Sequence, residues 1–329
     1  MNHTILLVMQ NFAGMGNLIL KNLKHSGFDA DFIFFDEVEK FRYKNIFHKV
    51  KTFYHKNILK DKNYKDNLRK EFRNKKLFEK AQLSKKYDTI LVINAEYFQE
   101  NFLLELSKHT NNFVGFHWDG IKRTPEIVSK ISIFRKFYVF DKADNVYSNT
   151  EFLTNFYFDF PEENDQELKH NLLYIGTFVK ERFKKILKII EIFKKINKQT
   201  KIILVTLDKK VIKEHQNSSL DLRRSLLTYD ENINLVKNSQ VLLDLKLKEH
   251  NGLSFRFFEA MKYKKKLITD NSTVKEYDFF CPENIFVLES NNVEELQNFI
   301  EKPYTEINKS IFEKYSFTNW IKTITKNDE

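Results

Sequence analysis

Residues 249–271, EHNGLSFRFFEAMKYKKKLITDN, place a turn, a helix start and a strand in an order that predicts an anion-binding site. Gly252 permits the turn, because a residue without a Cβ adopts backbone conformations that others resist, and Ser254 is placed to cap the next helix. That helix is expected from about Phe255 to Tyr263, and its first turn offers free N–H groups and the positive end of the helix dipole. Arg256 adds a cation to the same turn. A phosphate group would fit between them.

A second loop with basic residues follows the predicted strand at 172–177, LLYIGT. Gly176 and Thr177 end the strand, and Lys180 and Arg182 stand at the beginning of the helix that follows. Ligands of open parallel sheets bind at the carboxyl ends of the strands, where helix N-termini meet. These two basic residues are therefore candidates for binding a phosphate group, and ordinary solvated helix residues are the alternative interpretation.

In the first half of the chain, the sequence NFAGMGN follows the first predicted strand. Gly14 and Gly16 fall between this strand and a helix, and Asn17 begins the helix. The residue at position 19 is Ile19, so the glycine pattern of a dinucleotide-binding loop is incomplete. The loop predicts either a close approach of the backbone to a sugar or phosphate group, or a simple tight turn.

The sequence GFHWDGIKRTP at 115–125 follows another predicted strand and carries groups that can take up a proton. Asp119 is our candidate for a general base, and His117 is the second choice. Trp118 beside them is suited to contact a sugar ring or to pack in a core. Glu96, at the end of the preceding strand, is a weaker candidate for the same role.

Carboxylates that would bind a metal ion are not evident in the sequence. Asp141 and Asp144 lie in FDKAD, where they flank a turn and show no further ligand spacing. We therefore expect neither an essential metal nor a cofactor.

Strand and helix signals alternate through the chain, which is typical of α/β proteins with parallel sheets. Strands are expected at 4–9, 30–35, 89–94, 113–118, 172–177, 201–206, 241–246, 267–269 and 285–288. Two further short strands are expected around 141–149, separated by a turn. Helices are expected at 17–25, 98–108, 181–196, around Leu220, at 255–263 and at 307–322. The hydrophilic stretch at 161–171 interrupts this order. It predicts a domain at 1–160, with a basic helical insertion at 40–86, and a domain at 161–329.

The length of 329 residues and a hydrophobic content of 42% suit two α/β domains. The one cysteine, Cys281, cannot form an internal disulfide. The apolar stretch at 5–9 is too short for a signal peptide, and no run approaches the ~18 apolar residues of a membrane-spanning helix. These observations predict a soluble cytoplasmic protein.

The insertion at 40–86 contains 17 Lys or Arg residues against 4 Asp or Glu, so its net charge of +13 exceeds the +10 of the whole chain. Aromatic residues alternate with the basic ones, which predicts amphipathic helices. Such helices bind anionic lipid, at about 1 kcal/mol per basic residue near the surface. Solvated helix faces, contacts to phosphate groups of a substrate, and nucleic-acid binding are the alternatives.

The motif NGLSFRFFEA followed by KKLIT resembles the donor-binding motif of nucleotide-sugar glycosyltransferases of the GT-B fold. The form of the motif is similar to that of bacterial lipopolysaccharide and capsule biosynthesis proteins and of spore-coat glycosyltransferase-like proteins. The resemblance implies that Glu259 holds the nucleotide ribose. Asn251 stands where the retaining enzymes have a first glutamate, so the stereochemistry stays open.

The same resemblance implies that Arg182 matches a diphosphate-binding lysine, whereas Thr177 replaces an arginine whose charge Arg256 would supply. It implies that the loop at Tyr229 touches the base, and that the last helix crosses back to the first domain. It also implies two Rossmann-like domains facing a cleft, with the nucleotide-sugar donor on the second domain and a glycan or lipid-linked acceptor on the first.

The implied function is a metal-independent transfer of a sugar to a hydroxyl group in bacterial surface polysaccharide synthesis, namely of lipopolysaccharide or capsule. The enzyme would act in the cytoplasm or at the inner face of the plasma membrane, and no nucleic-acid partner is expected. Two other classes remain as alternatives. One is a nucleic-acid-binding protein that uses the insertion at 40–86, and the other is a sugar-nucleotide epimerase. The donor sugar, the acceptor and the oligomeric state stay open.

Overall fold

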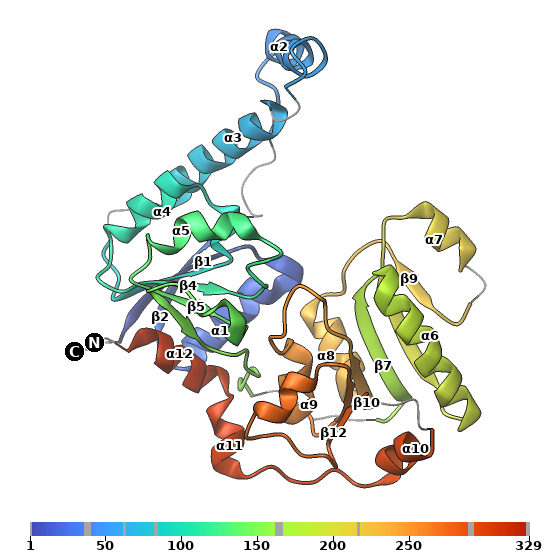
Figure 1. Cartoon of the computed structure of the whole chain (residues 1–329). Coiled ribbons are helices and arrows are strands. Elements are labelled where there is room, and N and C mark those ends of the chain that lie inside the picture. The colour runs from blue at the N-terminus through green and yellow to red at the C-terminus, as the bar shows by residue number, and fades with distance from the viewer. Residues whose placement is uncertain are drawn as a thin grey trace. The chain divides into compact units, whose positions relative to one another are not determined.

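The computed structural model describes residues 2–35, 41–61, 64–81, 85–161, 167–215, 218–288 and 293–326. The chain divides into two compact units (Figure 1). Unit 1 comprises Met1–Val139, Asp144–Phe152 and Ile324–Glu329, and unit 2 comprises Phe140–Ala143 and Leu153–Thr323. The predicted boundary patch at 161–171 lies within unit 2, and its residues 162–166 are outside the described part. Each unit is built on its own sheet.

The sheet of unit 1 has six parallel strands in the order β2-β1-β3-β4-β5-β6. The strands in chain order are β1 (Thr4–Met9), β2 (Asp29–Phe34), β3 (Thr89–Ile93), β4 (Phe113–His117), β5 (Lys136–Val139) and β6 (Thr150–Phe152). β1, β3 and β4 are continuous apolar runs because both faces of this sheet are covered.

The helices of unit 1 lie on both faces of its sheet (Figure 1). One face packs against α3 (Tyr64–Ala81), α4 (Glu100–Ser107) and α5 (Val128–Ile131), and α1 (Met15–His25) lies on the other. The remaining helix, α2 (Ile46–Asn57), contacts α3 and lies at the end of α3 far from the sheet. The described part of the insertion at 40–86, which omits residues 40, 62–63 and 82–84, is therefore helical as predicted.

The sheet of unit 2 also has six parallel strands, in the order β12-β11-β10-β7-β8-β9. The strands in chain order are β7 (His170–Thr177), β8 (Thr200–Val205), β9 (Asp221–Arg223), β10 (Ser239–Asp244), β11 (Lys266–Thr269) and β12 (Ile285–Val287). Two parallel sheets with flanking helices confirm the predicted α/β class of two Rossmann-like domains.

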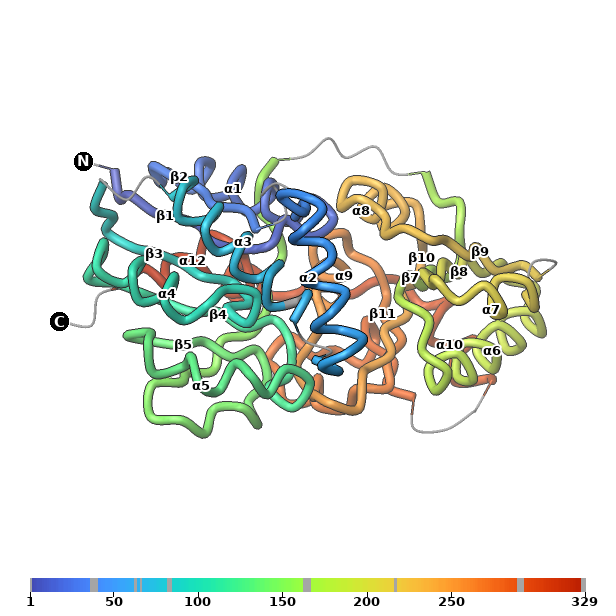
Figure 2. The backbone as a smooth tube through the Cα atoms, turned by 90° about the horizontal axis from the view of Figure 1, so that it is seen from above, coloured from blue at the N-terminus to red at the C-terminus, as the bar shows by residue number. Residues whose placement is uncertain are grey.

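Two clusters of apolar side chains cover the faces of the unit 2 sheet, and Figure 2 shows the helices that supply them. One face packs against α6 (Lys180–Lys195) and α10 (Val293–Glu301), and the other against α8 (Tyr229–Lys237) and α9 (Phe255–Lys262). The other helices in this part of the chain are α7 (Lys209–Glu214), α11 (Lys309–Lys314) and α12 (Phe317–Thr325).

Two sequence-based assignments of elements were wrong, and others were incomplete. The two short strands expected around 141–149 lie further out, at β5 and β6, and residues 142–144 form a 3-10 turn between them. The helical region expected around Leu220 is strand β9, which pairs with β8. The helix expected at 307–322 is divided into α11 and α12, and α10 was not predicted.

In the part of the chain that the structure describes, no helix is both long and apolar enough to cross a lipid bilayer.

Candidate functional site

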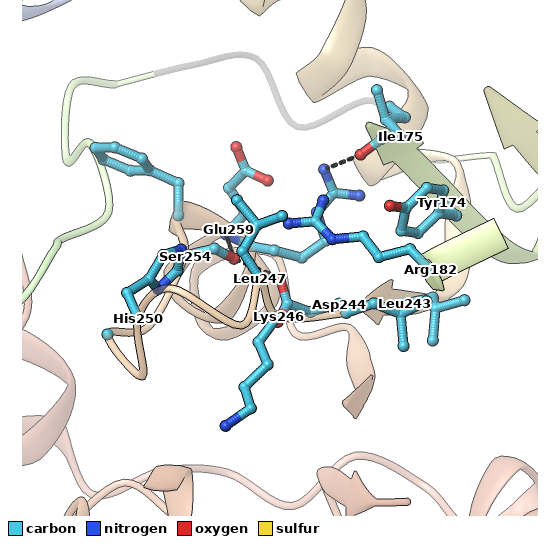
Figure 3. Close-up of a pocket in the computed structure, with 14 residues that line it drawn as sticks. Tyr174, Ile175, Arg182, Leu243, Asp244, Lys246, Leu247, His250, Ser254 and Glu259 are labelled. Atoms are coloured by element: carbon cyan, nitrogen blue, oxygen red, sulfur yellow. Dashed lines mark hydrogen bonds between the residues drawn. The ribbon is translucent and has the colours of Figure 1, made fainter. Parts of the chain in front are cut away.

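A cavity of about 300 Å³ opens in unit 2 where β7 and β10 end and α9 begins (Figure 3). This is the position at which parallel sheets bind their ligands. The cavity, called the unit 2 pocket below, is lined by apolar residues and by charged or polar ones, the latter being Tyr174, Arg182, Asp244, Lys246, His250, Ser254, Arg256 and Glu259.

Ser254 ties the start of α9 to the end of β10. Its hydroxyl accepts a hydrogen bond from the backbone N–H of Arg256 at 3.2 Å, as an N-cap does. The same hydroxyl donates to Oδ1 of Asp244 at 2.6 Å. The predicted helix and its cap are confirmed, and the cap also fixes a carboxylate that the sequence interpretation did not select.

Two guanidinium groups enter the pocket with part of their hydrogen-bonding capacity unused. Arg256 donates from Nη2 to the backbone oxygen of Ile175 at 3.3 Å, while its Nη1 is buried and has no hydrogen-bond partner in the described structure. The buried Nε of Arg182 is unpartnered in the same sense. Leaving a buried donor unsatisfied costs ~1–3 kcal/mol, so both groups favour a ligand with acceptor oxygens.

Two carboxylates balance these cations. Glu259 is only 6% exposed, and its Oε1 accepts a hydrogen bond from Nδ2 of Asn232 at 3.0 Å. Burial raises the pKa of Glu259, and the nearby Arg256 opposes this rise. Burial also raises the pKa of Asp244, against the hydrogen bond from Ser254 and the charge of Arg256. A ligand with hydroxyl groups can donate to such carboxylates, so the pocket suits a molecule that carries both hydroxyl and phosphate groups.

Gly252 lines the pocket for a reason other than the one expected. Its φ angle is not in the left-handed region, which among the described glycines only Gly14 and Gly27 adopt. A Cβ at Gly252 would lie 2.5 Å from the ring of Phe140. The glycine is therefore required for close packing and not for an unusual turn.

The structure brings Arg182, Gly252, Ser254, Arg256 and Glu259 together at one pocket. The other predicted donor-binding residues do not line it, and these are Gly176, Thr177, Lys180, Tyr229 and Asn251.

Each of the residues outside the pocket has an identifiable position. Gly176 gives space to the hydroxyl of Tyr174, which would lie 2.8 Å from a Cβ there. Thr177 and Lys180 are exposed at the end of β7 and the start of α6. Tyr229 packs edge-on against Phe158 with ring centroids 5.4 Å apart.

Asn251 is held beside the pocket from two sides. Its backbone N–H donates to Oδ2 of Asp141 at 2.6 Å, and its Oδ1 accepts from Nζ of Lys246 at 2.7 Å. Lys246 extends away from Arg182 and Glu259 in Figure 3. Asp141 thus anchors the backbone before Gly252, which gives this carboxylate a structural role.

The candidate proton acceptors of unit 1 differ in accessibility. Asp119 forms an ion pair with Nη1 of Arg123 at 2.8 Å, and its side chain is 25% exposed. His117 is 0% exposed, with Nε2 2.8 Å from Oγ1 of Thr124 and Nδ1 3.5 Å from Oε2 of Glu96. An acceptor hydroxyl could reach Asp119 directly, whereas His117 can act only through its neighbours.

The glycine loop before α1 has separate reasons for its two glycines. Gly14 has a φ of +82°, which favours glycine, and it occupies the N-cap position of α1. A Cβ at Gly16 would lie 2.8 Å from the ring of Phe34. Asn17 is exposed and its backbone N–H donates to Oδ1 of Asn11 at 3.2 Å. The proposed contact of this loop with a ligand stays a prediction.

Among the described residues, no group of three or more His, Cys, Asp or Glu side chains is arranged to hold a metal ion. The sequence interpretation missed Asp244, Lys246 and His250, which all line the unit 2 pocket. The signal was available in VLLDLKLKEH, because polar residues directly after a buried parallel strand lie at the binding edge of the sheet.

No protein-family model and no curated protein matches the chain. Similar folds occur among solved structures. The apo form of the lipopolysaccharide outer core galactosyltransferase WaaB is 14% identical, with 97% of each chain covered and a TM-score of 0.53. An alpha-glucosyltransferase in complex with UDP and a 13-mer DNA is 10% identical, with 99% of this chain and 100% of that chain covered and a TM-score of 0.55.

The N-terminal domain of Candida albicans trehalose-6-phosphate phosphatase is also similar, at 12% identity, with 98% of this chain and 96% of that chain covered and a TM-score of 0.58. Similarity over almost the whole length at such low identity is evidence about the fold. In its fold, the chain resembles the GT-B nucleotide-sugar glycosyltransferases.

Proposed function

We propose that the protein is a glycosyltransferase that binds a nucleotide-sugar donor in the unit 2 pocket. The observation that carries this proposal is the pairing of two incompletely bonded guanidinium groups with two carboxylates in one cavity. Arg182 and Arg256 bind the phosphate groups and stabilise the charge that develops on them when the sugar leaves. Glu259 accepts hydrogen bonds from hydroxyl groups of the ribose.

Binding of nucleotides tests the donor site. Arg182→Ala and Arg256→Ala should each weaken UDP binding about 10- to 100-fold, the loss expected for one charged contact of ~1.4–3 kcal/mol. Lys188→Ala is the matched control, because Lys188 is exposed on the same helix as Arg182 and does not line the pocket. A thermal-shift screen of UDP, GDP and CMP, followed by titration calorimetry, gives the affinities. Equal affinities in all three variants would exclude this site.

In the same proposal, the acceptor hydroxyl loses its proton to Asp119 in unit 1. The ion pair with Arg123 at 2.8 Å holds this carboxylate in place. Asp119→Asn keeps the shape and removes the basicity, so transfer should fall by two orders of magnitude or more while UDP affinity is unchanged. A variant that keeps its turnover number would remove Asp119 from the mechanism.

We further propose that no metal is required, because the cations of the unit 2 pocket can take the place of an ion on the diphosphate. Turnover should persist after dialysis against EDTA. Loss of turnover that Mg²⁺ or Mn²⁺ restores would reverse this part of the proposal.

A role in bacterial surface polysaccharide synthesis at the inner face of the plasma membrane is supported by the outer face of α2. Large apolar side chains on this face are between 47% and 79% exposed, and they are Ile46, Phe47, Val50, Phe53, Tyr54 and Ile58. At 100° per residue they occupy one continuous arc of the helix. A surface of this kind normally contacts another molecule.

The opposite face of α2 packs against α3. Thr52 is 4% exposed, and the ring of His55 stacks on Tyr64 with centroids 3.8 Å apart. Lys49 and Lys51 are exposed at the two borders of the apolar arc. An apolar arc bordered by lysines fits the interface of a bilayer with anionic head groups, which we propose as its partner.

Vesicle sedimentation tests this membrane contact. Phe47→Ser combined with Phe53→Ser should weaken binding to vesicles that contain phosphatidylglycerol. Leu207→Ser is the control, because Leu207 is 80% exposed and belongs to unit 2, whereas α2 belongs to unit 1. Binding of wild-type protein to duplex DNA, with no binding to vesicles, would instead favour the nucleic-acid alternative. Neither result depends on the donor site.

A further inference from the structure

A second cavity, of about 290 Å³, lies in unit 1 and is not used by any step above. It opens where β2 and β3 end, between α3 and the start of α4. This cavity is called the unit 1 pocket below. The residues that line it include Phe35, Lys70, Arg73, Asn74, Glu96 and Tyr97. α3 belongs to the basic insertion at 40–86, so the insertion supplies one wall of a cavity in addition to the outer face of α2.

The floor of the unit 1 pocket is held rigidly by Lys130. Its ammonium group donates to the backbone oxygens of Ala95, Glu96 and Phe98, at 3.2, 3.1 and 2.7 Å. These three bonds use all three donors of the lysine. The turn after β3 therefore keeps a fixed shape, and a positive charge lies beneath it.

Arg73 contributes a cation that is not paired with a carboxylate of any described residue. Its guanidinium lies 4.1 Å from the centre of the Phe35 ring, and none of the described residues forms an ion pair with it. Its side chain is half-buried, and burial and the neighbouring Arg69 both lower its pKa. The exposed ammonium of Lys70 adds a second positive charge at the rim. An anion bound here would relieve the repulsion between these groups.

Two residues with buried acceptor groups line the same cavity. Asn74 is 8% exposed, and its Oδ1 has no hydrogen bond to a described residue, although its Nδ2 donates to Asn101 at 3.1 Å. Glu96 has a side chain that is 8% exposed, and its Oε2 lies 3.5 Å from Nδ1 of His117 and has no hydrogen bond in the described structure. Buried acceptors of this kind favour a ligand that brings hydroxyl donors.

Aromatic rings complete the lining. Phe35 lies 5.5 Å from Tyr97 and 5.6 Å from Phe98, measured between ring centres. Apolar and aromatic walls with a few convergent polar groups are typical of small-molecule sites. The required ligand therefore has an apolar face, several hydroxyl groups and a negative charge.

From these groups we infer that the unit 1 pocket binds an anionic saccharide, with Arg73 and Lys70 on its carboxylate or phosphate and with Asn74 and Glu96 on its hydroxyl groups. This inference rests on the proposed function to the extent that the saccharide is the acceptor of the transfer. It narrows the acceptor to a sugar that carries a negative charge.

Titrations with glucuronate, glucose 1-phosphate, glucose and inorganic phosphate test the inference, with saturating UDP present to occupy the unit 2 pocket. The two anionic sugars should bind at least 10-fold more tightly than glucose and than inorganic phosphate. Arg73→Ala should remove this preference, and Lys75→Ala should not, because Lys75 is exposed on the same helix and does not line the pocket. The comparison of the two sugars tells a carboxylate from a phosphate.

Glucose binding as tightly as either anionic sugar, or equal losses in Arg73→Ala and Lys75→Ala, would overturn the inference. Inorganic phosphate binding as tightly as glucose 1-phosphate would overturn its saccharide part. Repeating the titration on Arg256→Ala separates the two pockets. That variant should lose UDP affinity and keep its sugar binding. In the wild-type protein, absent UDP binding with intact sugar binding would refute the proposed function alone, and UDP binding without sugar binding would refute this inference alone.

Discussion

At the residue scale, the unit 2 pocket holds buried carboxyl groups beside a partly buried guanidinium group. Glu259 and Asp244 each lie near Arg256, which opposes the effect of burial on the pKa of both carboxyl groups. The sequence motif predicted Ser254, Arg256 and Glu259 because turn, cap and helix spacing are local properties. Asp244 and His250 were missed, although both follow the buried strand β10. That they share a pocket with Arg182 depends on how β10 lies beside β7.

The pKa of Glu259, raised by burial, predicts a stability that falls with pH. The folded protein binds this proton more tightly than the unfolded chain does, so stability declines as pH rises from the unfolded pKa through the folded pKa. Glu259→Gln removes the loss of stability that comes from ionising this buried carboxyl group. Its melting temperature should exceed that of the wild type at pH 7, and the gap should close near pH 4, where the unfolded-state carboxyl also gains its proton.

Differential scanning calorimetry at several pH values measures this effect. A gap that stays constant between pH 4 and pH 7 would contradict it, because a packing effect of the substitution has no reason to titrate in this range.

Gly252→Ala should destabilise unit 2 by about 1–3 kcal/mol, because the added Cβ meets the ring of Phe140 at 2.5 Å. Gly27→Ala provides a contrast, since a Cβ there meets nothing within 4 Å and the strain comes only from its φ of +87°. Urea unfolding measures both losses. In a double-mutant cycle, Phe140→Leu should reduce the cost of Gly252→Ala but not that of Gly27→Ala.

At the element scale, buried parallel strands were predictable because their apolar runs are continuous. β1, β3, β4, β7, β8 and β10 all lie within two residues of their expected bounds. β9 was taken for a helix, since it has only three residues, all half-buried, and its strand form depends on pairing with β8. Edge strands of this length carry too few residues for a period to be recognised.

The caps of α8 and α9 allow the two roles of Ser254 to be separated. Ser254→Ala and Thr228→Ala each remove an N-cap and should each cost about 1 kcal/mol of stability. Only Ser254→Ala also frees Asp244 beside the phosphate groups, so it alone should weaken UDP binding. Chemical unfolding of both variants gives the free energy of unfolding, and calorimetric titration gives the UDP affinity. Equal UDP affinities in the two variants would limit Ser254 to a capping role.

At the whole-molecule scale, charge is divided unevenly along the chain. The insertion at 40–86 has a net charge of +13, while the rest of the chain is slightly acidic. This uneven distribution could be predicted directly, because the charged residues of a segment can be counted in the sequence without knowing the fold. The separation of the insertion into a pocket wall on α3 and an exposed arc on α2 was not predictable, since both helices contain the same types of residue.

Binding of the whole protein to anionic vesicles should therefore have two components, the attraction of the basic residues to anionic lipid and the apolar contact of α2. Raising the salt from 0.1 M to 1 M shortens the Debye length from about 10 Å to about 3 Å and should remove most of the preference for anionic lipid. The apolar contact of α2 should persist, so a weaker, composition-independent binding remains. Complete release at 1 M salt would show that the apolar arc does not enter the bilayer.

The chain passes between its two units more than once, and this has a practical consequence for anyone who divides the protein. The last segment of unit 1 begins at Ile324, near the end of α12. There the side-chain amide of Asn112 donates to the backbone oxygen of Ile324 at 3.3 Å, and Arg135 donates to that of Lys326 at 3.4 Å. A fragment that stops at residue 152 loses these two acceptors, although Asn112 keeps its bond to Thr89 and Arg135 keeps its bonds to Asn112. Supplying the C-terminal residues as a separate peptide should raise the melting temperature of the fragment. The carboxyl end of the chain would then stabilise unit 1 without a covalent link to it.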